Sequence, residues 1–164
     1  MNRKVAIIDP LGAHGSSFHF YVFGQALGLG NNNVHITIYT NDKTKNRLNF
    51  EMYNFYINIY KGYLFSRGIR YLVGSVKSIF HAKFRGVSVF HFHLFHANIF
   101  ILFNIFLVKL LFGKTVLTVH DVSSFANSSD SSIIARIIYK FTDLILTHNE
   151  FSKSEIIKVN ADLL

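Results

Sequence analysis

Short apolar runs alternate with longer stretches of helical periodicity along the chain. Strands are expected at the apolar runs Lys4–Ile8, Val34–Tyr39, Tyr53–Ile59, Val87–Phe92, Thr115–Val119 and Leu144–Thr147. Helices are expected between them, at about Ser16–Leu29, Tyr63–Phe80, His96–Phe112, Ser131–Phe141 and from Phe151 to the end. Strands that alternate with helices form βαβ units, so the pattern predicts an α/β fold: a Rossmann-like parallel sheet with helices on both faces.

The stretch Tyr63–Phe80 has two distinct faces at helical spacing. Arg67, Arg70 and Lys77 share one face. The opposite face is apolar and comprises Phe65, Ile69, Leu72, Val73, Val76, Ile79 and Phe80. Such a basic amphipathic helix suits a membrane surface, but it also suits an ordinary surface helix whose polar face is cationic.

The stretch Ala97–Phe112 is apolar on almost every side. It has 16 residues, fewer than the roughly 20 needed to cross a bilayer, and Lys109 interrupts it. A strand is expected directly after it, as in a βαβ crossover. The sequence therefore favours a core helix, with shallow insertion of its Phe-rich face into a membrane as the alternative.

Composition agrees with one well-packed domain covering residues 1–164, since half of the residues are apolar. The chain has no cysteine, which excludes a disulfide framework and thiolate metal sites. The first residues predict a buried strand rather than a signal peptide. A cytoplasmic protein is the expectation.

Positive charge is concentrated in one segment. Residues 52–120 contain eight basic residues and no Asp or Glu, whereas the other nine basic residues are matched by nine acidic ones. The net charge of +8 therefore comes from this segment and favours an anionic partner: a membrane surface, a diphosphate or nucleic acid. Nucleic acid is disfavoured, because the Phe residues follow core patterns and no nucleic-acid-binding module is recognisable.

The loop after the first strand contains glycines and a histidine. Gly12 and Gly15 allow a sharp turn close to a ligand, and Ser16 opens a helix whose N–H groups attract anions. His14, between the glycines, is a candidate general base. The alternative is a tight turn needed only for packing.

Three histidines lie at or just beyond the end of the fourth predicted strand. His91 and His93 are two residues apart, so a strand places them on the same face, and His96 begins the next helix. No carboxylate lies nearby in sequence, which disfavours a metal site. His93 is therefore expected to line a ligand site or to have a structural role.

His120 and Asp121 follow the buried strand Thr115–Val119 directly. They are expected at the carboxyl edge of the sheet, where open α/β sheets bind ligands. The alternative is a helix-capping Asp121 beside an incidental His120.

Taken together, these segments resemble the amino-terminal domain of GT-B glycosyltransferases, especially the GT4-like group. The likeness covers nearly the whole chain and includes an apolar helix, with the matching sequences LGAHGSS, SVFHFH, KTVLTVHD and TDLILTHNEFSK. It implies one acceptor-side domain that ends near Leu164, where the interdomain linker would begin. The E-x7-E signature of the family's nucleotide-sugar domain does not occur in this sequence.

By position, the resemblance implies that His120 contacts the transferring sugar near the reaction centre, and that the glycine loop approaches the donor phosphates and the acceptor. Asp143 matches an Asp with a structural role. The sequence departs from the pattern at Leu94, where an acidic residue is frequent, and at His148, which replaces a small polar residue.

The implied function is the acceptor-binding half of an enzyme that transfers a sugar from a nucleotide sugar to a glycan or lipid-linked acceptor in cell-surface polysaccharide synthesis. It would lie peripherally at the inner face of the membrane and need no metal or cofactor beyond this co-substrate. The donor would bind through a second domain or partner chain, so this chain alone is expected to be inactive. In a retaining transfer His120 stabilises the sugar and leaving-group region; in an inverting one His14 is the base.

The alternative belongs to another class of protein. It is a non-catalytic subunit that anchors at the membrane and recruits the acceptor for a separate donor-binding chain.

Overall fold

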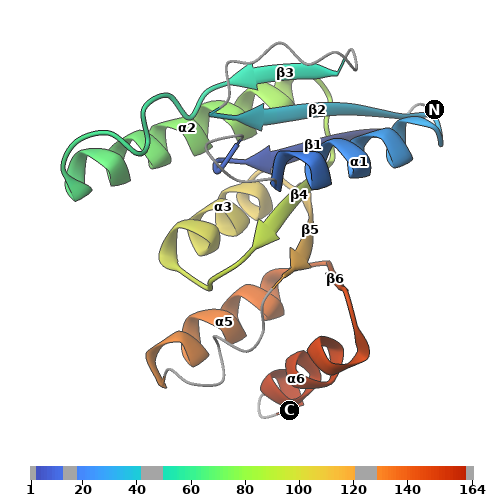
Figure 1. Ribbon diagram of the computed structural model, residues 1–164, viewed down its shortest axis with the longest axis vertical. Helices are drawn as coiled ribbons and strands as arrows, with labels where there is room; N and C mark the ends of the chain where they lie inside the picture. The colour runs from blue at the N-terminus through green and yellow to red at the C-terminus, as the bar shows by residue number, and fades with distance from the viewer. Residues whose placement is uncertain (1–2, 13–17, 42–49, 121–128, 162–164) are drawn as a thin grey trace. The chain divides into compact units, whose positions relative to one another are not determined.

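The computed structural model describes residues 3–12, 18–41, 50–120 and 129–161. The elements are β1 (Arg3–Asp9), α1 (Phe18–Gly30), β2 (Val34–Thr40), β3 (Glu51–Asn54), α2 (Leu64–Phe84), β4 (Val89–Leu94), α3 (Ile99–Leu110), β5 (Lys114–Val119), α5 (Ser129–Phe141), β6 (Leu144–Thr147) and α6 (Glu150–Ala161) (Figure 1). The strands form one parallel sheet in the order β3-β2-β1-β4-β5-β6. The α/β class predicted from the sequence is confirmed.

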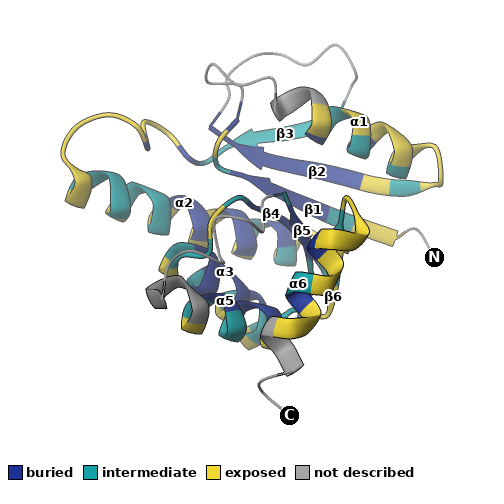
Figure 2. Cartoon of the chain, turned by 60° about the horizontal axis from the view of Figure 1, so that its bottom comes forward, coloured by how far each residue is buried: buried dark blue, intermediate teal, exposed yellow. Residues whose placement is uncertain are grey.

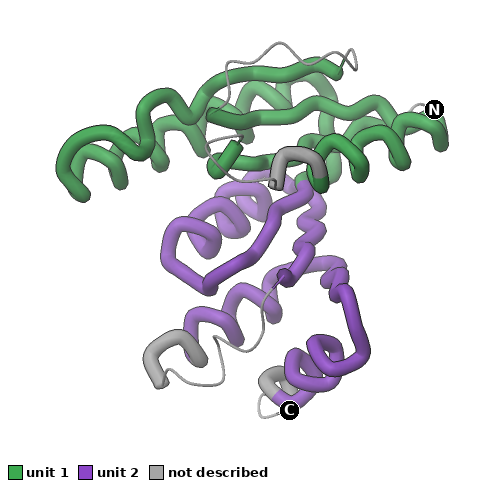
Figure 3. Tube along the Cα trace, in the orientation of Figure 1, with its two compact units in different colours: residues 1–90 green, residues 91–164 purple. Residues whose placement is uncertain are grey.

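The chain divides into two compact units, residues 1–90 and 91–164 (Figure 3). In the first unit, β2 pairs with β1 on one side and β3 on the other. Helix α1 covers one face of these strands, and its Val22 and Ala26 pack against Ile7 and Ile38. Helix α2 lies on the other face, where Nδ1 of His81 is 2.8 Å from the hydroxyl of Tyr39.

In the second unit, β5 and β6 pair in parallel and α3 packs against both β5 and α5. The side chain of Asn98 caps α3 by accepting hydrogen bonds from the N–H groups of Phe100 and Ile101. One face of α3 is buried, including Ile105 and Val108, so the helix contributes to the core as the sequence favoured. Within the described part of the chain, no helix has the length and apolarity needed to span a bilayer.

The strand predicted at Tyr53–Ile59 is largely wrong. The observed strand β3 covers Glu51–Asn54, two residues earlier, and the chain then enters turns. Asn58 adopts a φ of 56°, a left-handed conformation that ends an extended run. The apolar positions that led to the strand prediction continue through these turns, because Tyr56 and Ile59 are buried by packing outside the sheet.

Helix α2 packs mainly through a face other than the apolar face expected from the sequence. Figure 2 marks its buried and exposed residues. The residues that it buries are mostly small: Gly74, Ser75, Ser78, Ile79 and Ala82. Its large apolar residues form an exposed row at spacings of three and four, which we call the outward stripe: Phe65, Ile69, Val73, Val76, Phe80 and Phe84. Most of the apolar face predicted from the sequence is therefore not the face that packs.

Tyr56 explains why α2 packs through small residues. Its ring is fully buried between the strands and α2, and its hydroxyl donates a hydrogen bond to Ser75 at 3.3 Å. A Cβ at Gly74 would lie 2.7 Å from the Tyr56 ring and 2.9 Å from the carbonyl oxygen of Phe55. The large side chain at this interface is Tyr56, which precedes the helix in sequence. Helix α2 can therefore pack against it only through small side chains.

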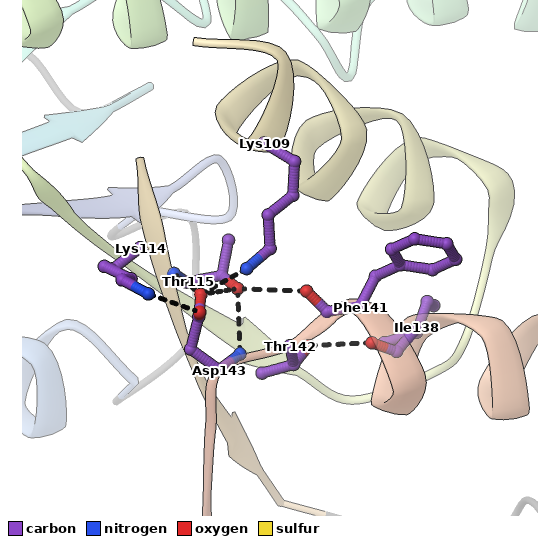
Figure 4. A network of polar contacts seen from close by, with 7 residues as sticks. All are labelled: Lys109, Lys114, Thr115, Ile138, Phe141, Thr142 and Asp143. Carbon is purple, nitrogen blue, oxygen red and sulfur yellow. Dashed lines mark hydrogen bonds and ion pairs between the residues drawn. The ribbon is translucent and has the colours of Figure 1, made fainter. Parts of the chain in front are cut away.

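Asp143 joins three elements of the second unit (Figure 4). Its carboxylate accepts hydrogen bonds from the N–H and hydroxyl of Thr115, at 2.7 and 3.0 Å, and pairs with Lys109 of α3 and Lys114 of β5. Burial alone would raise the pKa of Asp143, but these hydrogen bonds hold it well below its ordinary value. The amino ends of β5 and β6 are thus fastened to α3 by one charged side chain.

Candidate functional site

Four histidines gather at the carboxyl ends of β4, β5 and β6. The rings of His91 and His93 stack with centroids 4.9 Å apart on one side of β4. His93 Nδ1 lies 3.1 Å from His120 Nε2, and His120 Nδ1 lies 3.1 Å from His148 Nε2. We call this set, His91, His93, His120 and His148, the histidine cluster.

The register of the strands explains why the cluster forms. Val119 of β5 lies beside Thr147 of β6, so the next residues, His120 and His148, leave the sheet side by side. The N–H of His120 also donates to the carbonyl oxygen of Leu94 at the end of β4. Three adjacent strand ends therefore present imidazoles at the edge where α/β sheets bind ligands.

Two further residues hold the rings in place. Phe95 stacks on His120 with centroids 4.7 Å apart and an interplanar angle of 13°. The hydroxyl of Thr118 lies 2.8 Å from His91 Nε2. His120 and His91 are thus oriented by more than their histidine neighbours.

Burial keeps three rings of the histidine cluster neutral, those of His91, His93 and His120. Desolvation, helped by the other histidines, lowers the pKa of His91 and of His120 to about 4 and that of His93 to about 2. At neutral pH each of these rings therefore has one N–H donor and one lone-pair acceptor. Such a set suits hydrogen bonding to hydroxyl groups better than neutralisation of a diphosphate.

The structure brings together three of the residues singled out in the sequence, His91, His93 and His120. Sequence reasoning missed the role of His148 and the contacts of Thr118 and Phe95. A signal was present, since β5 and β6 end in the similar sequences LTVH and LILTH, and paired parallel strands place such residues together. Among the described residues, no group of three or more His, Asp or Glu side chains could hold a metal ion.

Gly12 lies in the first unit and is tightly enclosed. It adopts a φ of 57°, its N–H donates to Asp9 Oδ1 at 3.2 Å, and a Cβ would lie 2.1 Å from Asn41 Oδ1. Asn41 in turn donates to the carbonyl oxygens of Pro10 and Leu11. These contacts are those of a packed turn; a ligand-binding role for Gly12 stays a prediction.

The remaining candidates, His14, Gly15, Ser16 and Asp121, lie outside the described residues. Their proposed roles as base, phosphate-loop residues and partner of His120 therefore stay predictions.

The sheet order is that of one Rossmann-like half of a GT-B fold. Two solved structures share this arrangement. MurG of Acinetobacter baumannii matches with a TM-score of 0.57 and 11% identity over 88% of this chain and 41% of that one. The UDP-GlcNAc 2-epimerase from Methanocaldococcus jannaschii matches with a TM-score of 0.59 and 14% identity over 94% and 42%.

At these identities the likeness concerns the fold, and the chain spans about two fifths of the length of either protein. The sequence matches no protein-family model, and no curated protein is similar to it.

Proposed function

We propose that this chain is the acceptor-side half of a GT-B glycosyltransferase of the GT4-like group. In this proposal the histidine cluster contacts the transferring sugar or the acceptor. The observation that carries the proposal is the position of the cluster, at the carboxyl ends of three adjacent strands in a GT-B-like half fold. The neutral imidazoles offer donors and acceptors that match sugar hydroxyls.

The low pKa of His120 bears on the mechanism. A general base works best when its pKa lies near the working pH, and an imidazole with a pKa of about 4 is a weak base. This supports the retaining branch, in which His120 stabilises the sugar and leaving-group region. In the inverting branch His14 removes the acceptor proton.

Two experiments test this proposal. A nucleotide-sugar titration on this chain and on a version joined to a donor-binding domain should show affinity only in the second. In the complete enzyme His120→Ala should lower kcat at least 100-fold, on the order of the loss of one transition-state hydrogen-bond donor. Normal turnover by His120→Ala would exclude the role, and the anomeric configuration of the product separates retention from inversion.

We also propose that the chain binds an anionic membrane surface through α2, which would bring it to a lipid-linked acceptor. The outward stripe supplies apolar side chains, with Phe65 81% exposed and Phe84 87% exposed. Lys61 and Lys77 lie at or near the same helix, within a segment that has no acidic residue. Each basic residue near an anionic surface contributes about 1 kcal/mol.

Flotation with vesicles tests this second proposal. The chain should bind vesicles that contain phosphatidylserine and bind neutral phosphatidylcholine vesicles weakly. Ile69→Ser, in the outward stripe, should weaken binding several-fold, whereas Leu27→Ser should not. Leu27 is a matched control because it is a similarly exposed apolar residue, 41% against 46%, on α1. Equal flotation with both kinds of vesicle would exclude the proposal.

The same helix favours a second candidate function, a non-catalytic subunit that recruits the acceptor for a separate donor-binding chain. A neighbouring reading frame that encodes a nucleotide-sugar domain supports this candidate. Continuation of the present frame into such a domain supports a single longer enzyme.

A further inference from the structure

Both ring nitrogens of His120 are engaged by other imidazoles. Its Nε2 faces Nδ1 of His93 and its Nδ1 faces Nε2 of His148, each at 3.1 Å. The three rings form a chain from His93, which is only 8% exposed, to His148, which is exposed. Each link needs one N–H and one lone pair, so the proton positions of the three rings depend on one another.

Only two neutral arrangements satisfy both links. In the inward arrangement, His148 Nε2–H donates to His120 Nδ1, and His120 Nε2–H donates to His93 Nδ1. In the outward arrangement, His93 Nδ1–H donates to His120 Nε2, and His120 Nδ1–H donates to His148 Nε2. The tautomer of His120 is opposite in the two.

We propose that His148 is a positioning residue that sets the tautomer of His120. When His148 takes up a proton from solvent, both of its nitrogens carry hydrogen, so its Nε2 can only donate. His120 must then accept at Nδ1 and hold its own proton on Nε2. The added proton and its charge stay on His148, and His120 remains neutral with a fixed tautomer.

The charge does not move inward, because each inner ring is more costly to ionise. Burial lowers the pKa of His120 to about 4 and that of His93 to about 2. His148 lies at the exposed end of this chain of rings, where solvent and ligands can reach it. A ligand that donates a hydrogen bond to Nδ1 of His148 would have the same effect on His120, whereas a ligand that accepts from Nδ1–H of a neutral His148 would favour the opposite tautomer of His120.

The described ionisable groups beside this chain of rings include His91 at one end and, close to His148 in the sequence, Glu150 and Lys153. His91 stacks on His93 at the buried end of the chain. Glu150 and Lys153, at the start of α6, pair with each other at 3.1 Å. Asp121 follows His120 in sequence and lies outside the described residues.

NMR on the chain labelled with 15N in its histidines tests the proposal. Between pH 8 and pH 5, the His120 nitrogens should move to the Nε2–H pattern with the same midpoint as the protonation of His148. In His148→Gln, whose amide can hydrogen-bond but does not titrate, this step should disappear. His148→Ala should also abolish the step and should raise the pKa of His120, because His148 is one of the groups that lower it.

His35→Ala is the control, since His35 is a histidine of the first unit and pairs with Glu51 of β3. It should leave the His120 step unchanged. The proposal is overturned if the His120 nitrogens stay constant while His148 titrates, or if the step persists in His148→Gln. Amide spectra establish that each variant is folded. The experiment needs neither donor nor acceptor, so its failure would leave the transferase proposal intact.

Discussion

At the residue scale, the two ends of the β5–β6 pair differ in the charge of their polar side chains. At the amino ends, Asp143 is kept charged by two lysines and by the N–H and hydroxyl of Thr115. At the carboxyl ends, His120 and its neighbours are kept neutral by burial and mutual repulsion. The charged end fastens the strands, and the neutral end is available for hydrogen bonding.

Asp143→Asn should destabilise the fold by about 2 kcal/mol at pH 7, because charge-assisted hydrogen bonds are lost. The folded pKa of Asp143 is depressed, so its stabilisation is present above the unfolded pKa of about 4 and disappears as the pH falls towards the folded value. Urea unfolding at pH 7 and pH 3 should therefore show a smaller difference between variant and wild type at pH 3. Glu150→Gln removes an exposed pair with Lys153 and should cost no more than about 0.5 kcal/mol. Equal losses in both variants would contradict this prediction.

Buried neutral histidines should make the chain sensitive to mild acid. His91 has a folded pKa of about 4 and an unfolded one of about 6.5, so the unfolded chain binds more protons between these values. Its contribution is fully present above pH 6.5 and falls by about 1.4 kcal/mol per pH unit below it. Denaturant unfolding of His91→Gln between pH 7 and pH 5 should show a flatter pH dependence than wild type. Parallel curves would show that His91 is protonated equally in both states.

The sequence predicted part of the candidate site. The position of His120 after a buried apolar run placed it at the sheet edge, and the two-residue spacing put His91 and His93 on one face. His148 was not found because its meeting with His120 depends on the pairing of β5 with β6. That pairing is a tertiary feature, which residue types alone do not encode.

At the scale of elements, the buried side chain of Tyr56 determines which face of α2 packs. Helical periodicity identified its two faces, but it does not say which face packs. Tyr56 fills the space over the strands and leaves room only for Gly74, Ser75 and their small neighbours. The burial of Tyr56 also explains why the strand predicted at Tyr53–Ile59 extends beyond β3. Tyr56 is an apolar position that is buried outside the sheet.

Gly74→Ala tests this arrangement. The new methyl group would lie 2.7 Å from the Tyr56 ring and 2.9 Å from a backbone oxygen, so overpacking should destabilise the chain by about 1–3 kcal/mol. Gly24→Ala in α1 is the matched control, because among the described residues nothing outside the neighbouring backbone of its own helix lies within 4 Å of the new Cβ. It should be neutral or stabilising by up to about 1 kcal/mol. Thermal unfolding of both variants measures the contrast; similar melting temperatures would contradict it.

At the scale of the whole molecule, the uneven distribution of charge is the dominant feature. The surplus of eight positive charges falls within residues 52–120, which include α2 and its outward stripe. Apolar and cationic groups therefore come from the same segment. Neither part alone would give strong binding to a surface at physiological salt.

Binding to anionic vesicles should accordingly weaken as salt rises from about 50 mM to about 500 mM, because salt screens exposed charges. The double variant Lys61→Gln and Lys77→Gln should bind several-fold less at low salt and depend less on salt. Lys153→Gln, on α6 and paired with Glu150, should behave as wild type. Binding that does not respond to salt would show that charge has no part in it.

The outward stripe also bears on the lifetime of the chain in a cell. Exposed rows of Phe, Ile and Val are features that drive self-association and expose a protein to quality control. In a chain that is bound to a membrane through the outward stripe, these side chains are covered. In a chain that exceeds the available membrane surface, they stay exposed to water. If the membrane proposal holds, we therefore expect the amount of this protein in a cell to follow the available membrane surface rather than the rate at which the protein is synthesised.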